Sequence, residues 1–269
     1  MMKICVSTLG CPSWEWSEIV STVKDFGYNG IEVRGIGNEL FVPRAKVFSE
    51  GEIDRTKQRL RALELTITCL TSGCLLHKSD KDYVSEGKAY IDLAQRLGCR
   101  YVRVLGDTNP EPGEAVDTEL VRERLSELAA YGEDKGVMPL IETNGYFADS
   151  DHMRSLLEQV HMANLGVVWD IHHPYRFCGE SPEQTFKTLK PYIRHVHVKD
   201  SKLVDGKLTY VMMGEGDVPV LDCARLLAES GYDGFLSLEW VKRWYENLTE
   251  PGIVFMQFAD YMKGLLSKI

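Results

Sequence analysis

The sequence of 269 residues lacks several patterns that would each define a class of protein. Its seven cysteines form no C-x-x-C pair, and their odd number argues against a disulfide framework or a zinc–thiolate site. No apolar run approaches the roughly 20 residues of a membrane span, and the start MMKICVSTLG has no basic segment before a long apolar stretch. We therefore expect buried, apolar cysteines, no membrane partner and a reducing, cytoplasmic location.

Positive charge is also scarce in this chain. Lys and Arg number 31 against 40 Asp and Glu, which gives a net charge of −9, and no run of Lys and Arg occurs. Proteins that bind nucleic acid usually carry a basic excess or a basic stripe. The charge balance therefore disfavours a nucleic-acid partner, whereas it leaves open whether the chain forms a homo-oligomer.

Short β-rich runs alternate with longer helical patterns along the whole chain. Strands are expected at 3–8, 30–34, 65–71, 101–105, 138–142, 166–170, 193–199 and 235–239. The helices between and after them are expected at 14–26, 51–64, 82–97, 117–135, 150–160, 182–190, 219–230 and 251–267, with an irregular segment before 219. Eight such units predict an α/β fold, a parallel sheet closed into one (β/α)8 TIM barrel over residues 1–269.

Metal-binding side chains gather at the ends of the last four expected strands. They are Glu142, Asp170, His172, His173, His195, His197 and Glu239, and Lys199 follows the two histidines of its strand. Because alternate residues of a strand share one face, His195, His197 and Lys199 should point into the barrel, toward the mouth where active sites of this fold lie. Carboxylates gathered there repel one another unless a cation compensates. The pattern therefore predicts one divalent ion, and its oxygen and nitrogen donors suit Mn, Mg, Co or Zn alike.

Six segments resemble the xylose-isomerase-like TIM-barrel superfamily, which includes the sugar phosphate isomerases and epimerases. The segments are GIEVR (30–34), LIETN (140–144), VVWDIHHPYRFCGE (167–180), HVHVKDS (195–201), GEGDVP (214–219) and GYDGFLSLEW (231–240). The resemblance implies that Glu142, Asp170, His197 and Glu239 bind one metal and that His173 binds substrate. His197 is preferred to His195 because the ketose epimerases of the superfamily ligate at that position.

The resemblance also implies an enzyme of carbohydrate metabolism. It would be an isomerase or epimerase of a small sugar or sugar phosphate that removes a proton α to a carbonyl and forms an enediolate stabilised by the metal. Glu142 and Glu239 would remove and return the proton. Lys199 and Trp14 are further candidates for contacts with this polyhydroxylated substrate. Lys199 could instead pair with Asp200 or another carboxylate, and Trp14 could pack against a helix.

Other functions share parts of this pattern. Ala148 and Leu203 stand where the ketose 3-epimerases carry Glu and Arg, which argues against a free-ketose 3-epimerase of that type. The same enolate with a β-hydroxyl leaving group would give a dehydratase of the keto-inositol or dehydroshikimate type. An apurinic endonuclease would need more His and acidic ligands, and the strand at 101–105 ends without one. A non-catalytic metal-binding barrel is the last alternative.

Two more features have two interpretations each. Glu32 and Arg34 end the second expected strand, where they either contribute to the mouth or form an internal ion pair. The segment GEGDVP (214–219) forms either a lid or backbone nest for a phosphate or a simple turn.

Overall fold

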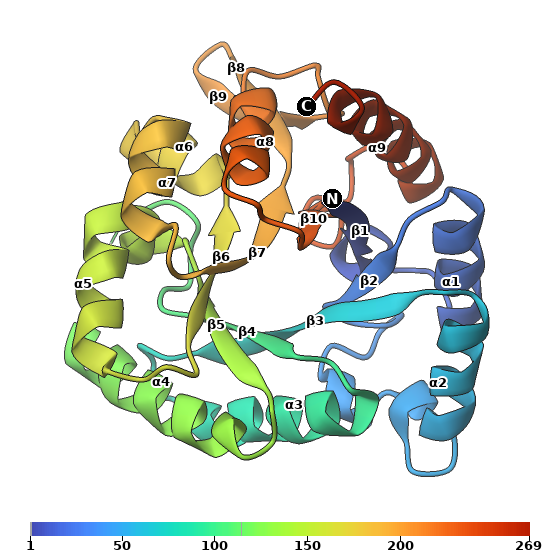
Figure 1. The fold of residues 1–269 in the computed structure, drawn as a ribbon, viewed down its shortest axis with the longest axis horizontal. Coiled ribbons are helices and arrows are strands. Elements are labelled where there is room, and N and C mark those ends of the chain that lie inside the picture. The colour runs from blue at the N-terminus through green and yellow to red at the C-terminus, as the bar shows by residue number, and fades with distance from the viewer. Residues whose placement is uncertain (1, 114) are drawn as a thin grey trace.

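A computed structural model describes residues 2–113 and 115–269 and shows a closed barrel of parallel strands (Figure 1). Around the barrel the strands follow the order β1-β10-β7-β6-β5-β4-β3-β2, and β1 pairs with both β2 and β10. The strands are β1 (Lys3–Ser7), β2 (Gly30–Val33), β3 (Thr66–Leu75), β4 (Tyr101–Leu105), β5 (Met138–Glu142), β6 (Gly166–Asp170), β7 (Ile193–Val198) and β10 (Phe235–Leu238). The predicted (β/α)8 fold is confirmed.

Helices form an outer ring around these strands (Figure 1). They are α1 (Trp16–Asp25), α2 (Ile53–Ala62), α3 (Tyr83–Leu97), α4 (Thr118–Glu133), α5 (Ser150–Val160), α7 (Pro182–Leu189), α8 (Val220–Glu229) and α9 (Pro251–Leu266). Local signals set several of their ends. The Asp82 carboxylate caps α3 by accepting the Ser85 N–H, and Gly98 ends this helix in the left-handed region at φ 71°.

The differences from the sequence prediction include an added helix and a hairpin. The short helix α6 (His172–Cys178) directly follows β6, and its seven residues are too few to show a helical period. The expected irregular segment after β7 is instead an antiparallel hairpin of β8 (Asp200–Val204) and β9 (Lys207–Val211). Its turn residues Asp205 and Gly206 have φ values of 50° and 75°, so the Asp-Gly pair is a hairpin signal that the sequence prediction missed.

The core lies between the barrel and its helices. Val196 and Val198 of β7 line the same small cavity as Cys223 and Leu227 of α8. The valines therefore face the helices, as the alternation predicts. All seven cysteines are free thiols, and all except the half-buried Cys178 are buried. Within the described ranges, no helix has both the length and the apolar character needed to cross a bilayer.

Candidate metal centre and cavity

Glu142, Asp170, His197 and Glu239 converge at the carboxyl ends of β5, β6, β7 and β10. One ligand atom of each lies within 4.8 Å of the others, and all four residues are buried. The strand register produces this arrangement, because Asp170 is paired with His197 and the Glu239 N–H donates to the Val198 carbonyl at 3.0 Å. The structure thus brings together the four residues expected to bind the ion, although binding itself stays a prediction.

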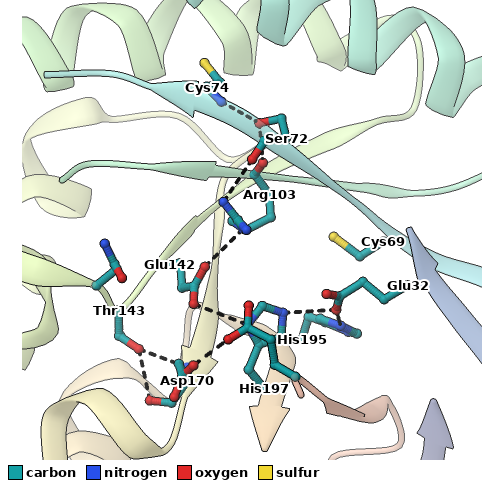
Figure 2. Close-up of polar contacts among 12 residues, drawn as sticks. Glu32, Cys69, Ser72, Cys74, Arg103, Glu142, Thr143, Asp170, His195 and His197 are labelled. Carbon is teal, nitrogen blue, oxygen red and sulfur yellow. Dashed lines mark hydrogen bonds and ion pairs between the residues drawn. The ribbon is translucent and has the colours of Figure 1, made fainter. Parts of the chain in front are cut away.

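Backbone contacts orient the carboxylate of Asp170. Its Oδ1 accepts the His172 N–H at 2.9 Å, which leaves Oδ2 for the other members of the cluster. The Thr143 hydroxyl accepts the Asp170 N–H at 2.9 Å and donates to the Asp170 carbonyl at 3.2 Å (Figure 2). Thr143 therefore joins the ends of β5 and β6 and fixes how Glu142 and Asp170 lie relative to each other.

The imidazole of His197 connects the cluster to the barrel interior. Its Nδ1 lies 3.2 Å from Glu142 Oε1 and 3.5 Å from Glu239 Oε1, whereas its Nε2 lies 3.0 Å from Glu32 Oε2. The same Glu32 oxygen lies 2.7 Å from His195 Nε2 (Figure 2). His197 thus faces the cluster, while His195 contacts Glu32 beneath it.

Charge holds this buried group together. Burial alone would raise the pKa of Glu32, but His197 and His195 outweigh burial and hold that pKa well below its ordinary value. Burial alone would lower the pKa of His197, but Glu32, Glu239 and Glu142 raise it well above its ordinary value. Glu32 is therefore an outer carboxylate that fixes the orientation of the His197 ring, in the way that carboxylates commonly hold metal-binding histidines.

We expect Glu32→Gln to weaken the binding of Mn²⁺ by about 10–100-fold, because the amide holds the His197 ring less firmly. Isothermal titration calorimetry measures the affinity directly. Glu180→Gln is the matched control, since Glu180 is also buried but bonds the Ser150 N–H and the Thr185 hydroxyl outside the cluster. Equal affinities for the two variants would contradict the role given to Glu32.

Lys199 is the buried cation of the cluster. Its Nζ donates to Asp170 Oδ2 and, at 2.7 Å, to Glu239 Oε2. Its pKa is raised because Asp170 and Glu239 outweigh the burial that would lower it. Of the partners considered for Lys199, the structure therefore selects other carboxylates and not Asp200.

Asp200 organises the segment that follows the hairpin. Its carboxylate accepts the N–H groups of Gly214 at 2.9 Å, Gly216 at 3.0 Å and Val218 at 3.3 Å. A Cβ at Gly216 would clash with Asp200 Oδ1, so only glycine allows this approach. The N–H groups of GEGDVP that could have held a phosphate are thus already bonded to Asp200.

Arg103 of β4 is a site residue that the sequence prediction missed. Its Nε lies 3.0 Å from Glu142 Oε2, and its Nη1 donates to the Ser72 carbonyl at 3.0 Å (Figure 2). Burial would raise the pKa of Glu142, but Arg103 and His197 outweigh it and keep this carboxyl ionised. The available signal was a charged residue between Val102 and Val104, in the middle of an otherwise apolar strand.

The two histidines after β6 point to different partners. His173 Nδ1 donates to the Thr143 carbonyl at 2.9 Å, and Nε2 lies 3.5 Å from Asp170 Oδ2. Burial lowers the pKa of His173, which favours the neutral ring. His172 Nε2 lies 2.9 Å from the Ser201 hydroxyl, so this ring supports the hairpin.

A cavity of about 390 Å³ opens above the cluster. The residues that line it include Arg34, Gly73, Arg103, Glu142, Asn144, His173, Lys199, Tyr210, Glu239, Trp244 and Tyr245. The predicted contacts His173 and Lys199 are among them. Trp14 is not, because its ring packs edge-on against Phe255 of α9 at 5.5 Å between centroids.

The aromatic wall of the cavity comes from segments with no strand-end signal. Tyr210 lies on β9, and Trp244 and Tyr245 lie in the connection between β10 and α9. Ala148 is buried and Leu203 is 57% exposed on the hairpin, and neither lines the cavity. The positions at which this chain departs from the ketose 3-epimerases therefore lie outside the cavity wall.

The chain belongs to the xylose isomerase-like TIM barrel family, whose model matches residues 20–257. Fructoselysine 3-epimerase of Shigella flexneri is 25% identical over an alignment of 281 positions, which covers 98% of each chain. The probable 3-DHS dehydratase AsbF of Bacillus anthracis superposes with a TM-score of 0.78 at 19% identity, over 97% of this chain and 99% of that one. A xylose isomerase-like TIM barrel protein of Mycobacterium smegmatis in complex with magnesium superposes with a TM-score of 0.76 at 17% identity, over 100% of this chain and 97% of that one.

Proposed function

We propose that this protein is a divalent-metal-dependent epimerase or isomerase of a small sugar or sugar phosphate with a carbonyl group. The observation that carries the proposal is that the four residues of the cluster differ in their position relative to the cavity. Of the four residues of the cluster, Glu142 and Glu239 line the cavity, whereas Asp170 and His197 do not. Two carboxylates could thus contact both a bound ion and the substrate. The likeness to a fructoselysine 3-epimerase supports an epimerase.

The donor set suits a hard divalent ion. Three carboxylates and one imidazole, all buried and converging, match the oxygen and nitrogen ligands that Mn, Mg, Co or Zn accept. Glu142, Asp170, His197 and Glu239 would hold the ion. When bound, it would supply a Lewis acid for vicinal substrate oxygens and stabilise the negative charge that follows loss of the α proton.

Glu142 and Glu239 have similar surroundings. One oxygen of each faces a buried cation, since Glu142 Oε2 lies 3.0 Å from Arg103 Nε and Glu239 Oε2 lies 2.7 Å from Lys199 Nζ. The other oxygen of each faces His197 Nδ1. Arg103 and His197 outweigh the burial of Glu142 and lower its pKa, so this carboxylate is ionised and can accept a proton. One carboxylate would remove the α proton, and the other would return a proton to the same carbon in epimerisation or to its neighbour in isomerisation.

Proton exchange tests this proposal. Protein loaded with Mg²⁺ or Mn²⁺ is incubated in heavy water with fructoselysine, ketoses and ketose phosphates, and the products are followed by NMR. We expect deuterium at a carbon next to the carbonyl, with no loss of water from the substrate. Loss of water would identify a dehydratase instead. Absence of exchange with every substrate and both metals would contradict the proposal.

His173→Ala should raise KM more than it lowers kcat. The neutral His173 ring donates through Nδ1 to Thr143, so Nε2 can accept a substrate hydroxyl in ground and transition states alike. Steady-state kinetics with the substrate found above separates the two constants. His152→Ala is the control, because His152 stacks on Tyr146 and does not line the cavity. A fall in kcat with unchanged KM would assign His173 to the chemical step.

A further inference from the structure

Arg34 lines the cavity on the side of β2 and β3, whereas the metal-binding cluster lies on β5, β6, β7 and β10. It follows β2 directly, and its N–H donates to the Thr8 hydroxyl at 2.9 Å, which fixes its backbone. The guanidinium carbon lies 5.7 Å from the ring centroid of Trp244. One face of the guanidinium is thus covered by an aromatic ring, as in cation–π contacts.

No described carboxylate neutralises Arg34 by an ion pair. The other two cations in the cavity wall are paired, Arg103 with Glu142 and Lys199 with Asp170 and Glu239. Glu32, two residues before Arg34, pairs instead with His195 and His197. Glu86, on the nearby helix α3, pairs with Lys81 at 2.5 Å. Of the cations in this wall, Arg34 alone lacks a counter-ion in the described part of the chain.

Arg34 is a charged and partly buried side chain at the edge of the cavity. Burial, together with repulsion from Arg103 and Arg243, outweighs the opposing effect of Tyr90 and Glu86 and lowers the pKa of Arg34 to about 10, so it remains charged at neutral pH. A Cβ built on Gly73 would lie 3.1 Å from Glu86 Oε1 and 3.7 Å from Arg34 Nη2, so the Glu86 carboxylate borders this space although its ion pair is with Lys81. Because Gly73 also lines the cavity and has no side chain, β3 itself places no side-chain atom between the guanidinium and the cavity.

We propose that Arg34 is the subsite for an anionic group of the substrate, a carboxylate or a phosphate. A planar guanidinium binds either group through two parallel N–H···O bonds, and a partly buried site strengthens them. The inference rests on the proposed function and narrows its substrates to acidic or phosphorylated ketoses. The carbonyl end would meet Glu142 and Glu239, and the anionic end would meet Arg34.

Binding of three ketoses tests the subsite. Calorimetry on the Mg²⁺-loaded protein compares neutral D-fructose with D-fructuronate, a carboxylate, and D-fructose 6-phosphate. We expect at least one anionic ketose to bind about tenfold or more tightly than fructose. The ratio of the fructose Kd to the Kd of the anionic ketose measures this preference. Arg34→Met should bring the ratio close to one, and Arg34→Lys should keep part of the preference. Arg44→Met is the control, because Arg44 lies over the Phe41 ring at 5.2 Å and does not line the cavity.

Each outcome decides the proposal. The proposal is supported if the preference for the anionic ketose is lost in Arg34→Met and kept in Arg44→Met. The ketose that binds more tightly then shows whether the subsite prefers a carboxylate or a phosphate. Equal binding of all three ketoses, no measurable binding of either anionic ketose, or a ratio that survives in Arg34→Met would overturn it. If the ratio behaves as expected but no ketose exchanges deuterium, the proposed function fails and the anionic subsite stands. If deuterium exchanges without any preference for an anion, the anionic subsite fails and the proposed function stands.

Discussion

Glu239→Gln is expected to lower kcat by about 10²–10⁴-fold while the protein still binds its divalent ion. Glutamine keeps the shape of the side chain and one ligand oxygen, but its amide cannot accept and return a proton. Glu239 lines the cavity and is the carboxylate that Lys199 holds at 2.7 Å, so its loss should affect proton transfer directly. Deuterium exchange and steady-state turnover measure the loss of activity, and metal content measures the retention of the ion.

Asp170→Asn gives the contrast for this experiment. Asp170 belongs to the same cluster but does not line the cavity, so the change should mainly weaken metal binding. Excess metal should then restore the activity of Asp170→Asn but not that of Glu239→Gln. If Glu239→Gln keeps most of its activity with metal bound, the scheme of two proton-carrying carboxylates is wrong. The carrier would then have to be His173, Lys199 or a bound water.

Lys199→Met is expected to lower the free energy of unfolding of the metal-free protein by about 3–5 kcal/mol. The change removes the ammonium group that bonds both Asp170 and Glu239, whose side chains are 0% and 8% exposed, and His197 Nδ1, at 3.9 Å and 3.5 Å from them, cannot replace both bonds. Charges buried without a partner are among the most destabilising changes in proteins. Urea unfolding of protein treated with EDTA measures the effect.

Adding a divalent ion should reverse much of this loss. An ion that binds only the folded state stabilises it, and in Lys199→Met it would also supply the missing positive charge. Saturating Mn²⁺ should therefore stabilise the variant more than the parent protein. Lys88→Met is the control: Lys88 pairs with Glu127 at 2.6 Å, but both side chains are solvent-accessible, and the expected change is about 1 kcal/mol or less. Unchanged stability of metal-free Lys199→Met would contradict the assigned role of Lys199.

The barrel could be predicted because its signals are local. Each strand and helix is a short run with its own pattern, and eight repeats of that pattern define the closed sheet. The cluster followed from the same logic, since parallel strands place their carboxyl ends at one rim. The resemblance added which histidine to choose, and the structure turns His197 and not His195 toward Glu142 and Glu239.

The rest of the site depends on packing that no local pattern records. Arg103 contacts Glu142 only because β4 and β5 are neighbours with a particular register. Trp14 and Trp244 both follow strands, yet Trp14 packs on Phe255 and Trp244 reaches the cavity. The path of each connection decides between these outcomes, and connections carry few periodic signals. A substrate wall is therefore harder to predict from sequence than a metal-binding rim.

The contacts of Asp200 make the hairpin a separate module of the barrel. The carboxylate of Asp200 binds three N–H groups of the returning chain, so the insertion closes on itself where it leaves and rejoins the barrel. Tyr210, a residue of the cavity wall, lies within the segment that this closure delimits. The hairpin is therefore a natural unit to exchange when the cavity wall is to be engineered, because the four residues of the cluster come from other elements.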